Sequence, residues 1–170
     1  MTIIIRKFRK GDGKGRAEIV NEGIRIRNWK YTGRNKLLSK KDIEKAKEDS
    51  SKKKGEICFV AIDKEKNKIV GSTEFFFKKN GRTRHRVDLG WGIHPDYQKK
   101  GVGTKLLRTA LQFAKKKGFK RAEAEMAIKN KGSVKLAKKL GFKIEGTKKK
   151  ALLTDDGKYI DTYIVGKILK

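Results

Sequence analysis

Hydrophobic and polar positions recur along most of this chain at the periods of strands and helices. Short runs rich in β-branched and aromatic residues, or alternating between apolar and polar positions, indicate strands. About seven strands are expected, at Thr2–Phe8, Glu56–Asp63, Lys68–Lys78, Arg84–His94, Ala122–Ile128, Phe142–Leu153 and Lys158–Ile168.

Apolar residues at helical spacing predict about four helices between these strands. The first holds Ile19 and Val20 and follows a turn at Gly11–Gly15. The second begins at Ser39–Asp42, which has the character of a capping box. The last two begin near Val102 and before Val134, and each ends at a glycine.

The turns between these elements predict how the strands connect. Asn80–Gly81 and Asp155–Gly157 are typical of hairpins, so the sheet is expected to be antiparallel in its first half. We find no internal repeat and no linker composition. The pattern therefore predicts a single α/β domain, in the broad sense that includes α+β, over residues 1–170.

The charge of the chain changes the picture of its surface and partners. The 170 residues carry a net charge of +28 at pH 7, and 36% are hydrophobic. Such a balance can indicate disorder, but the periodic pattern argues for a folded domain with a lysine-rich surface. A strongly positive field attracts anions, so nucleic acid, the ribosome, acidic proteins and phosphorylated cofactors are the partner classes it favours.

Few residue types suggest other chemistry. Cys58 stands alone within an apolar run and is expected to be a buried hydrophobe, while His85 and His94 lack the spacing of metal ligands. No metal is expected. No segment has the character of a signal peptide or a membrane span, so a cytoplasmic protein without membrane contact is predicted.

The candidate chemistry lies in Gln98–Gly103, between a predicted strand and a predicted helix. Gly101 and Gly103 let a phosphate approach the backbone amides of a helix N-terminus, and Lys99 and Lys100 add positive charge. The Walker and dinucleotide patterns do not fit, because position 106 is a leucine and no Gly-Lys-Ser/Thr run occurs. Gly11–Gly15 is a competing loop, but Asp12 would repel phosphate there.

Around this loop the chain resembles a known family. Leu89–Gly103 is similar to the acetyl-CoA-binding motif of the GNAT superfamily of N-acetyltransferases, whose core is Gln/Arg-x-x-Gly-x-Gly/Ala. Asn130–Ser133 followed by Leu140–Phe142, and Asp156–Asp161 near the end, resemble later blocks of that family. The resemblance covers about the whole chain and implies the GNAT fold, with a mixed central sheet splayed at the cofactor site.

The resemblance also implies which residues bind acetyl-CoA as the co-substrate. The backbone near Pro95 would line the pantetheine arm, and amides after Gln98 would hold the pyrophosphate. Asn130 would either bond the pantetheine or cap the next helix. The implied set is Trp91, Gly92, Ile93, Gln98, Lys99, Lys100, Gly101, Val102, Gly103, Thr104, Asn130 and Ser133.

For catalysis, the resemblance implies direct attack of an amine on the thioester. A base is useful because an amine with a pKa of about 10.4 is protonated at neutral pH. Asp88, seven residues before Pro95, aligns with an acidic residue of many members; Glu74 is the alternative and Glu125 a third. These carboxylates could instead form ion pairs with lysine or arginine, leaving no dedicated base.

One position departs from the family pattern. Where the family often has a tyrosine that protonates the leaving thiolate, this chain has Ala137. Tyr159 and Tyr163 are the alternative phenols, and water is another.

The predicted function is therefore transfer of an acetyl group from acetyl-CoA to a primary amine, on a protein N-terminus or a small molecule. The alternative is a GNAT-fold module that binds ribosome or RNA with little or no catalysis. Trp29 and Tyr31, among basic residues, could contact an acceptor, stack on RNA bases or pack between helices. A homodimer is compatible with the sequence.

Overall fold

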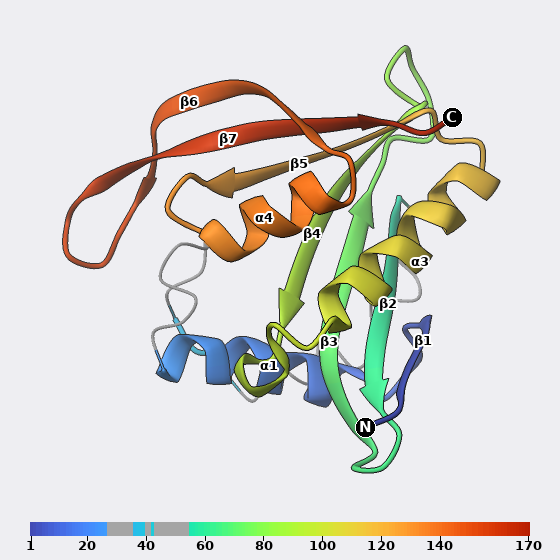
Figure 1. The fold of residues 1–170 in the computed structure, drawn as a ribbon, viewed down its shortest axis with the longest axis vertical. Helices are drawn as coiled ribbons and strands as arrows, with labels where there is room; N and C mark the ends of the chain where they lie inside the picture. The colour runs from blue at the N-terminus through green and yellow to red at the C-terminus, as the bar shows by residue number, and fades with distance from the viewer. Residues whose placement is uncertain (27–35, 40–41, 43–54) are drawn as a thin grey trace.

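The structure is a computed structural model that describes residues 1–26, 36–39, 42 and 55–170. Its centre is a seven-stranded mixed sheet in the order β1-β2-β3-β4-β5-β7-β6 (Figure 1). The contact between β4 and β5 is parallel, and the other neighbouring strands are antiparallel. The strands are β1 (Ile3–Lys7), β2 (Glu56–Asp63), β3 (Lys68–Phe76), β4 (Arg86–Ile93), β5 (Arg121–Ala127), β6 (Lys143–Leu153) and β7 (Tyr159–Ile168).

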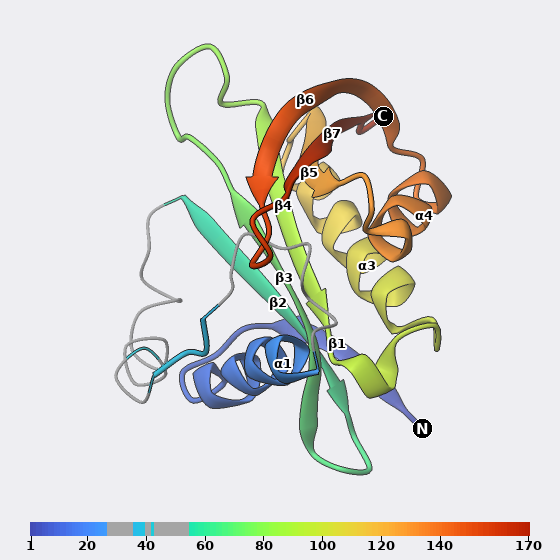
Figure 2. The same ribbon diagram turned by 90° about the vertical axis from the view of Figure 1, so that its left-hand side faces the viewer.

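Helices cover both faces of the sheet. The helix α1 (Gly13–Arg25) lies on one side, and α3 (Val102–Lys116) and α4 (Lys131–Lys139) lie on the other (Figure 2). A short 3-10 helix, η1 (Pro95–Tyr97), follows β4. The described residues show no helix that is long and apolar enough to cross a membrane. The helix expected after Ser39 falls outside the described residues, but Ser39 and Asp42 do exchange the reciprocal hydrogen bonds of a capping box.

The main hydrophobic core lies between α3 and the sheet. Leu106, Leu107 and Ala110 of α3 are buried against Phe75 of β3 and Leu89 of β4. Burying one leucine side chain contributes about 1.5–3 kcal/mol, so these contacts hold the start of α3 firmly over the centre of the sheet.

A smaller core cluster lies around β2. It contains Cys58 with Phe8, Val60 and Ile62. Cys58 is buried as predicted, and desolvation raises the pKa of its thiol to about 12. The thiol therefore stays protonated at neutral pH, as expected of a packing residue.

The sheet is splayed between β4 and β5. These strands pair only from Arg86–Asp88 to Arg121–Glu123, although β4 continues to Ile93 and β5 to Ala127. Beyond Asp88, the backbone groups of β4 that face β5 have no strand partner. This confirms the splayed mixed sheet that the sequence resemblance implied.

Two boundaries differ from the sequence prediction. β3 ends at Phe76 and β4 begins at Arg86, so a longer connection replaces the expected tight turn at Asn80–Gly81. A distant segment holds the connection in place: the ring of Phe77 packs edge-on against that of Phe119, after α3, with 5.1 Å between the ring centroids. The helix α1 begins inside the expected turn, at Gly13.

Candidate functional site

The loop from η1 to α3 has an unusual backbone. Lys99 and Gly101 both have positive φ angles, of 58° and 81°, and Gly101 is the N-cap of α3. The side-chain Nε2 of Gln98 donates a hydrogen bond of 3.2 Å to the carbonyl oxygen of Ile93, which ties the loop to the end of β4. The loop therefore presents the unpaired first-turn amides of α3 close to the splay.

The two glycines of this loop serve different purposes. A Cβ atom at Gly101 would meet open space, as expected where a ligand approaches. A Cβ atom at Gly103 would lie 3.0 Å from Leu136 and 3.5 Å from Ile93. Gly103 thus allows α4 to pack closely on the start of α3, a reason for glycine that the sequence did not reveal.

A first cavity of about 590 Å³ opens beside this loop. Every residue of the implied cofactor set lines it except Lys100 and Val102. Val102 is only 2% exposed and belongs to the core beneath the loop. The ammonium of Lys100 instead lies over the ring of Tyr97, 5.8 Å from its centroid.

Helix α4 supplies a positively charged wall to the first cavity. Lys131, Lys135 and Lys139 all line it, together with Lys99 from the loop. Residues four apart lie on the same face of a helix, so the three α4 lysines form one row. Sequence reasoning missed this row, because its signal, a spacing of four residues, is weak in a chain this rich in lysine.

Asn130 and Ser133 connect the first cavity to a second one. The Oδ1 of Asn130 accepts a hydrogen bond of 3.1 Å from the backbone N–H of Ser133, so Asn130 caps α4. This shows the capping role that the sequence left open. Both residues also line both cavities, so capping places them on a shared wall.

The second cavity, of about 340 Å³, occupies the open end of the splay. Its walls come mainly from β4, β5, β6 and β7. They are formed by Leu89, Gly90, Trp91, Glu125, Met126, Ala127, Asn130, Ser133, Ala151, Leu152 and Thr162. Trp91, Asn130 and Ser133 are common to the two cavities.

Among the described residues, Glu125 is the one carboxylate that lines either cavity. Its side chain accepts hydrogen bonds from Lys148 Nζ at 2.5 Å and from Thr162 Oγ1 at 2.6 Å. These bonds, that of Lys148 first, lower the pKa of Glu125, so the carboxylate is ionised at neutral pH. Sequence reasoning ranked it third among the candidate bases.

The two carboxylates ranked higher lie outside both cavities. Glu74 forms an ion pair with Arg16 of α1, which matches the non-catalytic interpretation. Asp88 is exposed at the last position where β4 pairs with β5. Partial desolvation, and then the charge of nearby Glu123, raise the pKa of Asp88.

No tyrosine among the described residues offers a free phenol at the cavities. Tyr159 is 62% exposed, and neither it nor Tyr163 lines a cavity. Tyr97 lines the first cavity, but its O–H donates a 2.7 Å hydrogen bond to buried Asp63. That bond, with burial, raises the pKa of Tyr97 to about 12. Ala137 is 1% exposed and belongs to the core.

The remaining sequence candidates have structural roles or lie outside the described residues. His94 is buried, and its Nδ1 accepts a hydrogen bond of 3.3 Å from the N–H of Asp96, which caps η1. Asp12, in the competing glycine loop, forms an ion pair with Arg6 at 2.6 Å. In the described part of the chain, no group of three His, Cys, Asp or Glu could hold a metal ion. Trp29 and Tyr31 fall outside that part.

Comparison with known proteins agrees with this geometry. Residues 24–142 match the family described as the Acetyltransferase (GNAT) family. The chain belongs to this family. The match spans both the Gln98–Gly103 loop and the splay between β4 and β5.

Individual GNAT relatives are similar over different lengths. The L-amino acid N-acetyltransferase AaaT of Escherichia coli K12 is 29% identical over 101 residues, which cover 59% of this chain and 62% of that protein. The alignments with the curated relatives span less than two thirds of each relative.

Solved GNAT structures match the fold over nearly the whole chain. The acetyltransferase of the GNAT family from Streptococcus pneumoniae superimposes with a TM-score of 0.84 at 25% identity, covering 99% of this chain and 100% of that one. A phosphinothricin acetyltransferase from Sinorhizobium meliloti, solved in complex with acetyl-CoA, superimposes with a TM-score of 0.84 at 22% identity. The match covers 99% of this chain and 89% of that one.

Proposed function

We propose that this protein is an N-acetyltransferase that moves an acetyl group from acetyl-CoA to a primary amine, on a protein N-terminus or a small molecule. The observation that carries the proposal is the meeting of two cavities at the splay, where they share Trp91, Asn130 and Ser133. A donor entering from one side and an acceptor entering from the other would meet there. Relatives named as N-acetyltransferases support the same activity.

The residues of the first cavity fit acetyl-CoA. Its phosphates need positive charge and amide donors, which the lysine row of α4 and the first turn of α3 supply. Its pantetheine arm carries amides, which need hydrogen-bonding partners along an extended path. The backbone groups of β4 beyond Asp88 that face no strand provide such partners, apart from the Ile93 carbonyl that Gln98 holds.

The residues of the second cavity fit an amine. Ionised Glu125 stands among apolar side chains such as Leu89 and Met126, and in this proposal an acceptor ammonium shares its carboxylate with Lys148, which lies 2.5 Å from it. A cavity with few polar groups and one charge is typical of a small-ligand site. In this proposal Glu125 binds and positions the acceptor.

Attack requires the amine to lose a proton. The low pKa of Glu125 makes it a weak base, whereas Asp88, with its raised pKa, is a stronger one. We propose that Asp88 removes the proton through water, which must bridge to the amine because Asp88 lies at the last β4–β5 pair and outside both cavities, and we set aside Glu74 because Arg16 holds it.

Bound acetyl-CoA supplies the activated thioester. The amine nitrogen forms the new bond to the acetyl carbon, the carbon–sulfur bond breaks, and the sulfur leaves as a thiolate. A thiol has a pKa of about 8.5, so the thiolate can leave without a tyrosine and take its proton from solvent. This accommodates alanine at position 137.

Two measurements test the proposal. Calorimetry should show binding of acetyl-CoA, and a thiol-release assay over a panel of small amines and N-terminal peptides should show turnover with at least one acceptor. Binding without release across the panel would favour the alternative, a binding module without catalysis. If millimolar acetyl-CoA neither binds nor raises the unfolding temperature, the proposal fails.

A matched pair of variants locates the binding. Gly101 and Gly118 lie at the two ends of α3, both have positive φ, and both have open space where a Cβ would stand. Gly101→Val and Gly118→Val should therefore cost similar stability, about 1–2 kcal/mol from left-handed strain. Only Gly101→Val should abolish acetyl-CoA binding.

A further inference from the structure

Four chain segments meet at the end of the sheet that carries the C-terminus (Figure 1). The carbonyl of His85, in the β3–β4 connection, accepts a hydrogen bond of 2.9 Å from the N–H of Lys120, after α3. The backbone N–H of Leu169, after β7, donates a hydrogen bond of 2.9 Å to the carbonyl of Lys120. Lys143, at the start of β6, pairs with Gly166 of β7.

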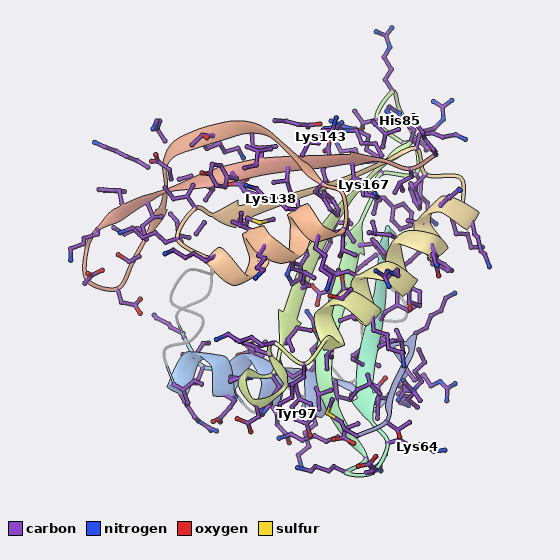
Figure 3. The ribbon with its side chains drawn as sticks, in the orientation of Figure 1. Lys64, His85, Tyr97, Lys138, Lys143 and Lys167 are labelled. Carbon is purple, nitrogen blue, oxygen red and sulfur yellow. The ribbon has the colours of Figure 1, made fainter. Side chains whose placement is uncertain are left out.

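These segments carry an excess of basic side chains, which together we name the terminal basic surface. It consists of Lys78, Lys79, Arg82, Arg84, Lys115, Lys116, Lys117, Lys120, Lys143, Lys167 and Lys170. All are exposed except Lys167, which is half-buried, and none forms an ion pair with another described residue. Figure 3 shows Lys143, Lys167 and His85 at this end and Lys64 at the opposite end.

Two of the acidic residues near this surface are already paired, whereas Asp88 and Glu56, beside the end of β3, form no ion pair with another described residue. Glu123 forms ion pairs with Arg86 at 3.3 Å and with Arg121 at 2.5 Å. Glu145 also pairs with Arg121. Neither carboxylate is therefore available to neutralise the exposed lysines.

The surface differs in its ion pairing from two other basic parts of the molecule. In the β6–β7 hairpin, Lys149 pairs with Asp161 at 2.9 Å and Lys158 with Asp156 at 3.0 Å. Helix α1 likewise mixes basic residues with Glu18 and Glu22. Unpaired lysines also occur elsewhere, as in the α4 row, but the terminal basic surface brings such residues together from four chain segments, where their fields add.

The side chains of this surface suit phosphate groups more than bases or lipid. Lysines act as point charges for phosphates. Two nearby rings are engaged, because Phe77 packs on Phe119 and Lys117 lies over Phe113 at 5.9 Å, and the exposed rings are Phe76 and His85. The exposed large apolar residues here, Phe76, Ile144 and Ile168, are few beside the basic side chains and offer little for membrane insertion.

We propose that the terminal basic surface binds the phosphate backbone of nucleic acid without reading its sequence. The surface is separate from the first cavity, since none of its members lines that cavity. The protein can therefore hold nucleic acid and its small anionic ligand at the same time. The inference does not depend on catalysis.

The test is fluorescence anisotropy with a labelled RNA duplex of about 20 base pairs, over about 50 to 300 mM salt. Parallel arms use a DNA duplex of the same sequence and vesicles containing anionic lipid. The affinity for duplexes should fall linearly on logarithmic axes, with a slope of about −0.9 for each phosphate contacted. Tighter binding of RNA than of DNA would show that the surface prefers an A-form duplex. Equal binding would show that it accepts the phosphates of RNA and DNA alike.

Two triple variants of equal charge locate the surface. Lys116→Gln/Lys117→Gln/Lys120→Gln should reduce the salt slope by about 2 to 3 and the affinity by at least about tenfold. The control, Lys14→Gln/Lys64→Gln/Lys66→Gln, removes three exposed charges that lie outside the surface and should change the slope by less than about one.

Four results would overturn the proposal. They are no duplex binding at about 50 mM salt, equal losses in the two triple variants, tighter binding to vesicles than to duplexes, or displacement of the duplex by saturating CoA. The last result would place the nucleic acid in the first cavity. Thermal unfolding of each variant confirms that the comparison is made on folded protein.

Discussion

The row of lysines on α4 allows a quantitative test of the first cavity. Lys131, Lys135 and Lys139 line it, whereas Lys138, on the same helix, is exposed and does not. The perturbation is replacement of the three lining lysines by glutamine, with Lys138→Gln as the control. Glutamine keeps most of the side-chain length and the helix propensity, so the change removes charge and little else.

The expected magnitude follows from the placement of the charges. A rise of 1.5 Å per residue spreads the row over about 12 Å of helix, so each lysine can face a different part of the phosphates. At about 5 Å in water, one pair of unit charges contributes about 0.8 kcal/mol. Physiological salt screens about half of that, which leaves about twofold in affinity per lysine. The triple variant should therefore bind acetyl-CoA about eightfold to tenfold more weakly.

Isothermal titration calorimetry at two salt concentrations is the assay. The loss should shrink at high salt, because screening weakens the wild-type protein more than the variant. Acetyl-pantetheine, which lacks the nucleotide phosphates, should show no difference between the proteins. Two results would contradict this expectation. One is a loss of acetyl-CoA affinity in Lys138→Gln as large as the loss per lining lysine, and the other is an equal loss of acetyl-pantetheine affinity in the triple variant.

Two carboxylates give further predictions. Glu125→Gln should raise KM for cationic acceptors at least several-fold and leave the Kd of acetyl-CoA unchanged. The control Glu145→Gln, which also removes an ion-paired glutamate, should change neither value. For Asp88, partial desolvation and Glu123 raise the folded-state pKa above 3.8, so ionisation of Asp88 reduces stability as pH rises through that range. Asp88→Asn should therefore raise the unfolding temperature at pH 7 but not at about pH 3; equal shifts at both pH values would contradict this.

Strong periodicity made much of the fold predictable. The bounds of β2 were predicted correctly, and the ends of β6 and β7 at Leu153 and Ile168 follow the alternation and the Asp155–Gly157 turn. Contacts between distant segments decided the rest. Gly13 and Gly15 disfavour a helix by about 1 kcal/mol each, so local propensity places them in a turn. The structure extends α1 over them because glycine lets the helix approach β3 closely: a Cβ at Gly15 would lie 3.1 Å from the side chain of Ile69.

The candidate site divides in the same way. The loop at Gln98–Gly103 was predictable because its glycines and its place between strand and helix form a local pattern. The lysine row of α4 was not, because in a chain this rich in lysine a regular spacing of three lysines carries little information. The alternation of β5 placed Glu125 on a polar face, but its access to a cavity depends on where β4 separates from β5.

Ala137 connects the sequence departure to the geometry of the splay. It lies four residues after Ser133, and therefore on the same face of α4, and Ser133 lines both cavities. Side chains on a helix lean toward its N-terminus, so a tyrosine at 137 would point toward the shared wall at Ser133. Alanine leaves that wall without a phenol while its own methyl group is buried in the core. On the proposed function, the departure changes how the thiolate gains its proton and leaves the binding of donor and acceptor intact.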